Sequence, residues 1–390
     1  MGIKKLFTFL NNNKLYDCYP YLNNLLDEYN YDKSATIVGV DANLFCYKYM
    51  HSYDNMLIGF FNQIIKFLSN KIIPLYIFDG GVLPEKEFTN NIRNNKKFYN
   101  KMRLDMLNKI IEDKNCNYNE LLELKKKYEK NSIKINNDYI NLLLELLDLL
   151  NIPYIFSFTE GDYLAVLLNK YKIIDFFLTD DTDPIPAGID NVIKFYNNNV
   201  YYLNTLKVYN TFKFSKEQFC DFCILLGNDY RSFHHSIKPS EIYNLIEKYK
   251  SIENILKYVE IKNINLEDLE IINKIRMIYG KGYLNEKNKF LELDKKDFFK
   301  YENLKNLSNI FIEYWDEYIE ILKIDIENKK LINENSLNLK KKIISLINEK
   351  KFNSNKIIKF IKKNIPDINN NEIKNIIVTF EYLNNLKKNN

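Results

Sequence analysis

Short apolar runs alternate with longer amphipathic stretches along the first 230 residues of the chain. The short runs have the length and composition of buried strands, and the stretches between them have apolar residues at helical spacing. Five strands are predicted, at residues 36–40, 73–78, 153–156, 174–178 and 192–195. This alternation predicts an α/β domain with a mostly parallel, Rossmann-like central sheet flanked by helices.

A long insert, residues 84–151, separates the second and third predicted strands. It is rich in Lys, Asn and Glu, and its pattern predicts several helices, of which 139–150 is apolar enough to be buried. Beyond residue 230 no strand pattern remains, and the chain to Asn390 is predicted to be helical. We therefore expect one α/β domain with a helical insert, followed by an all-helical extension.

Acidic residues follow three of the predicted strands directly. Asp41 comes after the first strand, Asp79 after the second, and Asp180, Asp181 and Asp183 after the fourth. The carboxyl ends of parallel strands lie at one edge of a sheet, where such folds bind their ligands. We therefore expect these three acidic strand ends to face one crevice.

Three further acids stand near helix ends. Glu160 and Asp162 open the helix after the third strand, and Asp229 follows the helix predicted at 216–226. Each has a purely structural alternative. Thr159 with Asp162 forms a helix-capping pattern, acids stabilise a helix N-terminus, and Asp229 alone is typical of a turn.

Taken together, these acids indicate a metal site. The group of seven is Asp41, Asp79, Glu160, Asp162, Asp181, Asp183 and Asp229. Crowded carboxylates repel one another, and divalent cations relieve that repulsion. Hard oxygen ligands in a chain with three histidines favour Mg²⁺, with Mn²⁺ able to substitute, over zinc. More acids than one ion needs indicate two ions, the arrangement that hydrolyses phosphodiesters.

Basic residues are distributed unevenly, although the net charge of +5 does not by itself indicate a nucleic-acid partner. They gather near 96–103, 125–130 and 340–351. Each cluster is equally well explained as a solvated helix face in a Lys- and Asn-rich protein. The Asn runs, such as 197–199, indicate compositional bias from an AT-rich genome more than a function.

The N-terminal sequence and the cysteines indicate in which cellular compartment the protein is expected. No apolar run is long enough to span a membrane, and no signal peptide or myristoylation context is present. Five cysteines at irregular spacing do not form a disulfide framework. We expect an intracellular, reducing location, either the nucleus or a cytoplasmic site of viral replication, and no membrane partner.

In chain order these residues resemble the structure-specific 5′ nucleases of the flap endonuclease and XPG family. The resemblance runs from residue 1 to about 256. It rests on Met1-Gly2-Ile3-Lys4-Lys5-Leu6, Val40-Asp41-Ala42, Ile77-Phe78-Asp79-Gly80, Glu160-Gly161-Asp162, Thr179-Asp180-Asp181-Thr182-Asp183 and the segment FCILLGNDY at 222–230. It implies a PIN-like fold and a Mg²⁺-dependent flap endonuclease or 5′-3′ exonuclease acting in DNA replication, repair or recombination.

The resemblance also implies roles for basic and aromatic residues. Lys86 and Arg93, at the family's spacing from Asp79, would steady the scissile phosphate, and Tyr47 would stack on a base. The alternatives are solvated cations and a core tyrosine. The insert is far shorter than in XPG-like members, which favours a flap endonuclease-like member whose insert forms an arch over the site. Basic residues in the arch, Lys125, Lys126 and Lys127, would guide the single strand.

Three departures from the family pattern stand out. Asp162 replaces the family's Glu, which keeps the charge but shortens the reach, so its ion would be held through water. Ser236-Ile237-Lys238-Pro239 stands where the family has a potassium-binding Gly-Ile-Gly-Pro hairpin. Losing both glycines argues against K⁺ binding, and Lys238 would contact a phosphate directly. No sliding-clamp motif is recognised, and the tail from about 325 resembles nothing in the family.

The expected organisation is a nuclease domain at 1–230 with its arch at 84–151, a helix-two-turn-helix region at 231–325, and a Lys/Asn-rich helical tail at 326–390. The expected partner is DNA with a 5′ flap or a junction, bound by a monomer. Four of the acids, Asp41, Asp79, Glu160 and Asp162, would hold one ion, and the other three would hold the second.

Two other functions stay open. One is a DNA-binding scaffold of the same fold that has lost catalysis, which the altered residue 162 and the altered hairpin permit. The other is a haloacid-dehalogenase-like phosphatase, although Asn43 occupies the place where that chemistry needs a second Asp. Turnover of a small phosphomonoester would distinguish the phosphatase.

Overall fold

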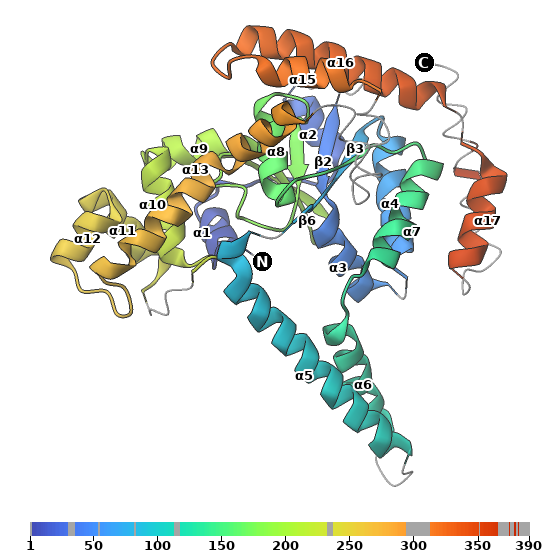
Figure 1. Ribbon diagram of the computed structural model, residues 1–390, viewed down its shortest axis with the longest axis horizontal. Coiled ribbons are helices and arrows are strands. Elements are labelled where there is room, and N and C mark those ends of the chain that lie inside the picture. Colours follow the sequence, from blue (N-terminus) through green and yellow to red (C-terminus); the bar gives the residue numbers. More distant parts are fainter. Residues whose placement is uncertain are drawn as a thin grey trace.

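An α/β body carries a projecting pair of helices, α5 and α6, and a layer of C-terminal helices (Figure 1). The computed structural model describes residues 2–29, 36–53, 55–81, 83–112, 118–231, 237–293, 313–350 and 352–365, together with 374, 378, 379 and 381. Cys116, Ser236 and most of the tail beyond 365 therefore lie outside the described residues.

Seven strands form one sheet in the order β1-β7-β6-β5-β2-β3-β4. Their bounds are β1 Asp17–Tyr19, β2 Ile37–Asp41, β3 Ile73–Phe78, β4 Tyr154–Phe156, β5 Phe176–Leu178, β6 Asn191–Tyr196 and β7 Asn199–Asn204. The strands from β6 to β4 run parallel, while β7 and β1 add an antiparallel edge. All five predicted strands are confirmed, and the sheet is mostly parallel as expected.

The antiparallel edge is a feature that the sequence pattern missed. β6 and β7 are joined by Asn197 and Asn198, whose φ values of 48° and 63° are left-handed. Asn tolerates this conformation better than most residues, and a pair of such residues suits a tight hairpin. Two asparagines of the run at 197–199 therefore form the turn of this hairpin.

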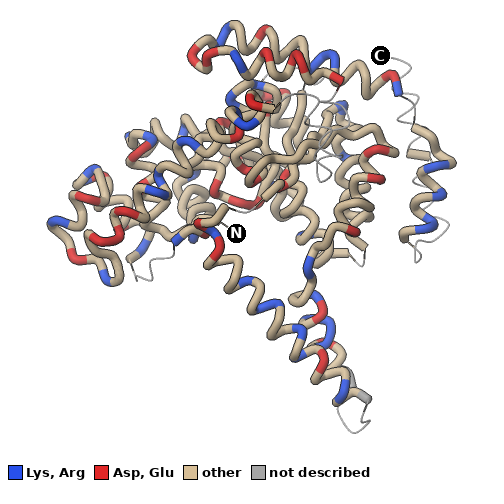
Figure 2. Tube along the Cα trace, viewed as in Figure 1, with Lys and Arg blue, Asp and Glu red and all other residues tan. Residues whose placement is uncertain are grey.

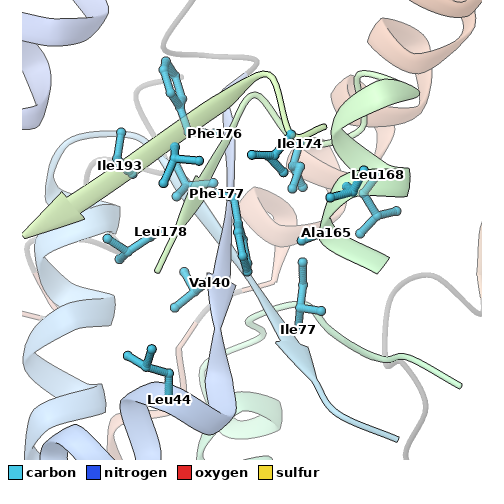
Figure 3. Close-up of a cluster of buried hydrophobic side chains, with 14 of the residues drawn as sticks. Val40, Leu44, Ile77, Ala165, Leu168, Ile174, Phe176, Phe177, Leu178 and Ile193 are labelled. Carbon is cyan, nitrogen blue, oxygen red and sulfur yellow. The ribbon is translucent and has the colours of Figure 1, made fainter. Parts of the chain in front are cut away.

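Helices cover both faces of the sheet because consecutive crossovers run in opposite directions along it. α3 Ala42–Ser52 and α4 Met56–Ser69 connect β2 to β3, whereas α8 Gly161–Lys170 connects β4 back to β5. Figure 3 shows the core that this arrangement buries, with Val40, Ile77 and Phe177 at its centre. Burial of each large apolar side chain contributes about 1.5–3 kcal/mol, which fixes the strand ends that carry the acids.

The insert has the helical structure that its pattern predicts. It consists of η2 Pro84–Lys86, α5 Glu87–Glu112, α6 Tyr118–Ser132 and α7 Asn137–Leu149. α7 buries Leu143, Leu144, Leu146 and Leu147, which confirms it as the buried helix. α5 and α6 pack mainly on each other and extend away from the body (Figure 1).

Helices dominate the rest of the described chain, as predicted. They are α1 Leu6–Asn12, α2 Leu22–Glu28, α9 Thr205–Phe212, α10 Lys216–Leu226, α11 Pro239–Tyr249, α12 Ile252–Tyr258, η3 Leu266–Asp268, α13 Leu269–Glu292, α15 Trp315–Lys323, α16 Lys329–Glu349 and α17 Ser354–Asn364. α13 packs closely on α8, because Gly282 lies against the ring of Tyr163. Within the described residues after 230, the only β pairing is an isolated bridge between Ile261 and Ile264.

α16 is tied to the body rather than appended to it. Ser336 Oγ donates to the carbonyl of Tyr171, and Lys340 Nζ lies 2.7 Å from Asp175 Oδ1 in a buried ion pair. None of the described helices is long and apolar enough to cross a bilayer. Cys18, Cys46, Cys220 and Cys223 are free thiols.

Candidate active site at the carboxyl edge of the sheet

The order of the strands brings the predicted acids to one edge. β5, β2, β3 and β4 are consecutive neighbours in the sheet, and all four run in the same direction. Asp41, Asp79, Glu160, Asp181 and Asp183 follow the carboxyl ends of these strands. The acids therefore lie at the ends of four adjacent strands, at one edge of the sheet, as the sequence predicted.

Asp41 and Asp79 lie on the two central strands. Asp41 caps α3, accepting the Leu44 N–H at 3.0 Å, and its other oxygen accepts the Thr179 hydroxyl at 2.9 Å. Burial and the nearby charge of Asp79 raise the pKa of Asp41 to about 7. Asp79 Oδ1 accepts the Gly161 N–H at 2.7 Å, which joins the ends of β3 and β4.

Thr159 and Asp162 do not form a capping arrangement at the start of α8, so that alternative was wrong, although Asp162 does lie in the first turn of the helix. Glu160 is the N-cap residue of α8 but makes no side-chain capping bond, and the Thr159 hydroxyl donates to Glu286 instead. Glu160 Oε2 pairs with Lys86 Nζ at 2.8 Å. Burial raises the pKa of Asp162 far above its ordinary value, and repulsion from Asp181 adds to it.

Asp181 and Asp183 are held by the turn after β5. Asp181 Oδ1 accepts two backbone N–H groups, from Thr182 at 2.6 Å and from Asp183 at 3.2 Å. Asp183 is 3% exposed, and its Oδ1 accepts the Tyr279 hydroxyl at 3.2 Å. Burial and the charge of Asp181 raise the pKa of Asp183 to about 7.

Asp229 connects the site to the projecting helices. It stands in the turn after α10, where Gly227 has a φ of 90°. Its carboxylate pairs with Arg93 Nη2 at 2.6 Å, and its carbonyl accepts the Thr89 hydroxyl at 2.6 Å. Asp229 is therefore a turn residue whose side chain also holds the base of α5.

Lys86 and Arg93 both reach this edge, where they pair with Glu160 and Asp229, and their role towards a phosphate stays a prediction. Lys86 is buried, with its Nζ 3.5 Å from Asp183 Oδ2 and 4.8 Å from the centroid of the Tyr230 ring. The two cations thus neutralise part of the acidic cluster.

The described side chains hold no preformed metal site: no three His, Cys, Asp or Glu residues converge for one. The acids pair instead with Lys86, Arg93 and backbone N–H groups. Their chemistry nevertheless fits a hard divalent cation. All seven donors are carboxylates, and Asp183 Oδ2 is buried and makes no hydrogen bond within the described residues, with Lys86 Nζ 3.5 Å away as its nearby cation.

Gly2 is a site residue that no chemical reasoning from the sequence identified. Its φ of 78° is left-handed, and a Cβ added there would overlap Asp181 Oδ1. The next residue, Ile3, donates its N–H to Thr182 Oγ1 at 2.9 Å. The N-terminal segment therefore packs directly on the acidic turn, which accounts for the glycine in the opening motif.

Glu286 was also missed, because it lies in the middle of an ordinary amphipathic helix, α13. It is fully buried and accepts the Phe158 N–H at 2.9 Å as well as the Thr159 hydroxyl. The carbonyl of Thr159 in turn accepts N–H groups from Gly80 at 3.0 Å and Gly81 at 2.8 Å. Glu286 therefore supports the two loops that carry Asp79 and Glu160.

Two buried tyrosines complete the lining of the site. Tyr230 donates to Glu160 Oε2 at 3.4 Å and is hydrogen-bonded to Tyr163 through their hydroxyls. Tyr279 contacts Asp183. Tyr230 is the last residue of the motif at 222–230, so the family resemblance could have identified it as a site residue. Nothing in the sequence pattern around Tyr279 identifies it in this way.

The predicted DNA-contacting residues lie outside the acidic cluster. Tyr47 is half-buried on α3, with Lys97 Nζ 4.5 Å above its ring. On α6, Lys126 and Lys127 are exposed and Lys125 is half-buried. Lys238 is exposed at the start of α11. These assignments stay predictions.

Two family models match the chain. The XPG N-terminal domain matches residues 1–100 and the XPG I-region matches residues 151–229. The chain is 27% identical over 279 residues to flap endonuclease 1 of Enterocytozoon bieneusi, covering 67% of this chain and 74% of the relative. It is 25% identical over 359 residues to flap endonuclease 1 of Entamoeba histolytica, covering 87% and 81%.

A viral protein and a solved structure extend the comparison. The probable RAD2-like endonuclease 076L of Invertebrate iridescent virus 3 is 27% identical over 319 residues, covering 65% of this chain and 81% of the relative. The catalytic core of Rad2 in complex with DNA substrate superimposes with a TM-score of 0.56 at 16% identity. That match covers 97% of this chain and 100% of the Rad2 chain, and it shows a shared fold.

Proposed function

The chain belongs to the flap endonuclease and XPG family, and we propose that it hydrolyses DNA as a metal-dependent, structure-specific 5′ nuclease. The proposed cleavage site is the junction of a duplex with a 5′ single strand. The observation that carries the proposal is the row of acids at the ends of four neighbouring parallel strands, where Lys86 pairs with Glu160 and Arg93 pairs with Asp229.

The carboxylates suit two Mg²⁺ ions, for which Mn²⁺ would substitute. We assign Asp41, Asp79, Glu160 and Asp162 to one ion and the remaining three acids to the other. When bound, such ions activate a water molecule and stabilise the leaving oxygen of a phosphodiester. The raised pKa values of Asp41 and Asp183 support this assignment, because crowded buried carboxylates are stabilised by cations.

Lys86 and Arg93 stabilise charge on the scissile phosphate in this proposal. Both already pair with carboxylates, at 2.8 Å and 2.6 Å. A phosphate entering the crevice competes with Glu160 and Asp229 for these donors. Charge-assisted contacts of this kind strengthen as negative charge develops in the transition state.

The α5–α6 hairpin would guide the single strand. Its first helix starts at the site through Arg93 and Thr89, and Lys97 covers Tyr47 beside it. Exposed cations and aromatic rings are the combination that binds single strands without sequence preference. We place the activity in DNA replication, repair or recombination inside the cell, performed by a monomer without an assigned sliding clamp.

The decisive experiment is cleavage of an end-labelled 5′-flap DNA with Mg²⁺, beside a blunt duplex and a single strand. Wild type is compared with Asp181→Ala, which removes a ligand but leaves the DNA-binding surfaces intact. We expect cutting near the junction that is abolished in the variant, while both proteins bind the flap equally. Binding without cutting by either protein would indicate a DNA-binding scaffold, and turnover of a small phosphomonoester alone would indicate a phosphatase.

A further inference from the structure

α17 presents a face of uncompensated positive charge. Its exposed lysines are Lys356, Lys359, Lys362 and Lys363. No Asp or Glu occurs between residues 352 and 365. Figure 2 accordingly shows Lys or Arg but no Asp or Glu along this helix. Successive turns of the helix therefore carry positive charge on the same exposed face.

The lysines stand on a fixed support. Ile357, Phe360 and Ile361 are buried and hold α17 against the body beside α7. Asn55, in the loop between α3 and α4, donates to the carbonyl of Asn364 at 2.8 Å. The exposed face is therefore presented in one orientation rather than carried on a loose tail.

Lysines on the neighbouring helix α16 differ from those on α17, because they form ion pairs. On α16, Lys340 pairs with Asp175 at 2.7 Å and Lys342 with Glu317 at 2.9 Å. None of the four α17 lysines forms an ion pair with any described residue. Lysines three or four positions apart on a helix repel one another, so this unpaired face slightly destabilises the helix. A bound anion would remove this repulsion.

We propose that α17 binds the phosphate backbone of a duplex DNA arm, an inference that rests on the proposed nuclease function. Along a helix with a rise of about 1.5 Å per residue, Lys356 and Lys363 are about 10 Å apart, enough to contact successive phosphates of one strand. Exposed lysines on a docked helix bind phosphate without sequence preference.

The position of α17 defines the class of substrate. α17 lies beyond α7 at one side of the molecule, and α11, which begins after Lys238, lies at the other (Figure 1). The acidic edge stands between these two sides. A DNA that contacts both has a duplex arm on each side of the cleavage site, so a two-armed flap reaches α17 whereas a duplex end with a 5′ overhang, bound on the α11 side, does not.

The test replaces Lys356, Lys359, Lys362 and Lys363 with Gln, which keeps helix propensity. The matched control makes the same charge change on α16, at Lys329, Lys330, Lys341 and Lys342. Dissociation constants are measured from low to high salt for a two-armed 5′ flap and a one-armed 5′ overhang. Both sets of substitutions are placed in the Asp181→Ala background, so that the DNA stays intact.

We expect the α17 variant to bind the two-armed flap about tenfold more weakly than its parent. The salt dependence should become shallower, by about 0.9 in slope for each DNA phosphate that α17 no longer neutralises. Its affinity for the overhang stays unchanged. Equal weakening on both substrates, unchanged affinity, or the same weakening in the control would overturn the proposal. Thermal unfolding checks that α17 remains docked.

Failure of the nuclease proposal is recognised separately. Cleavage of the overhang by the α17 variant with Asp181 restored should equal that of wild type, because α17 is remote from the acids. If wild type cuts neither substrate, the nuclease proposal fails, while the binding comparison still decides whether α17 holds a duplex arm.

Discussion

The acidic edge of the sheet and the α5–α6 hairpin are built in opposite ways. At the edge, most of the carboxylates are fixed by backbone N–H groups, hydroxyls, Lys86 or Arg93, and most are at least half-buried. On the hairpin, large apolar side chains such as Phe98 and Tyr99 are about 60% exposed beside exposed lysines. Substitutions at the edge should therefore have large, non-additive effects on chemistry, whereas those on the hairpin should have graded effects on binding.

The largest effect that sharpens this contrast is expected from Gly2→Ala. A Cβ at this left-handed position would overlap Asp181 Oδ1, so the acidic turn must shift. Because small displacements of catalytic groups are costly, we expect cleavage to fall about 100-fold with unchanged DNA affinity. Single-turnover cleavage and anisotropy titration measure the two quantities.

Gly280→Ala is the matched control, since a Cβ at Gly280 meets nothing within 4 Å. It should leave cleavage unchanged and stabilise α13 by about 0.5–1 kcal/mol. Equal activity of the Gly2 and Gly280 variants would show that the N-terminal segment does not position Asp181.

Glu286→Gln should have the next largest effect. Glutamine cannot accept from both the Phe158 N–H and the Thr159 hydroxyl in the same geometry, so the loops carrying Asp79 and Glu160 loosen. We expect kcat to fall about tenfold, the Mg²⁺ concentration for half-maximal activity to rise, and KM for DNA to stay unchanged. Glu292→Gln, exposed near the end of the same helix, should change none of these. A fall in melting temperature with kcat unchanged would show that Glu286 stabilises the fold but does not position the acidic residues.

Substitution of the hairpin should act on binding alone. Replacing Lys125, Lys126 and Lys127 with Glu removes cations that lie outside the acidic cluster. We expect flap affinity to fall several-fold with a weaker salt dependence, while cleavage at saturating DNA is retained. A blunt duplex, which has no single strand, is the control substrate. Unchanged flap affinity across the salt titration would make this cluster a solvated helix face.

The smallest effect is expected for an ion pair that stabilises the fold and lies outside both the acidic edge and the hairpin, the pair of Glu253 with Arg276. Hydrogen bonds from Arg276 lower the pKa of Glu253 to about 2 from its ordinary 4.5. A depressed carboxyl pKa stabilises the fold above the ordinary value, and this contribution is lost as the pH falls from about 4.5 towards 2. Because Glu253 is 34% exposed, Glu253→Gln should lower the free energy of unfolding by less than about 1 kcal/mol at pH 7.

Urea unfolding at pH 7 and pH 3.5 measures this difference. Glu320→Gln, which breaks an exposed pair with Lys323, is the matched control and should change little at either pH. A Glu253 effect that grows as the pH falls would contradict the assigned sign. Cleavage by both variants should equal that of wild type.

The sequence alone was sufficient for much of the site. Asp41, Asp79, Asp181 and Asp183 follow apolar runs directly, so local pattern and the geometry of parallel strands place them at one edge. The antiparallel strands β1 and β7 could not be predicted in this way, because β1 has three residues and is defined only by its pairing with β7. The capping alternative at Thr159 likewise failed, because its hydroxyl partner lies 127 residues away.

By itself, the sequence determined which residues are acidic, where the strands end and which family pattern they follow, since these depend on local order along the chain. Only the tertiary structure decided that Gly2 packs on Asp181, that Glu286 supports two loops and that α17 lies opposite α11. These relations join segments far apart in sequence. Close packing and long-range hydrogen bonds create them, and neither produces a periodic pattern of apolar and polar residues from which it could be predicted.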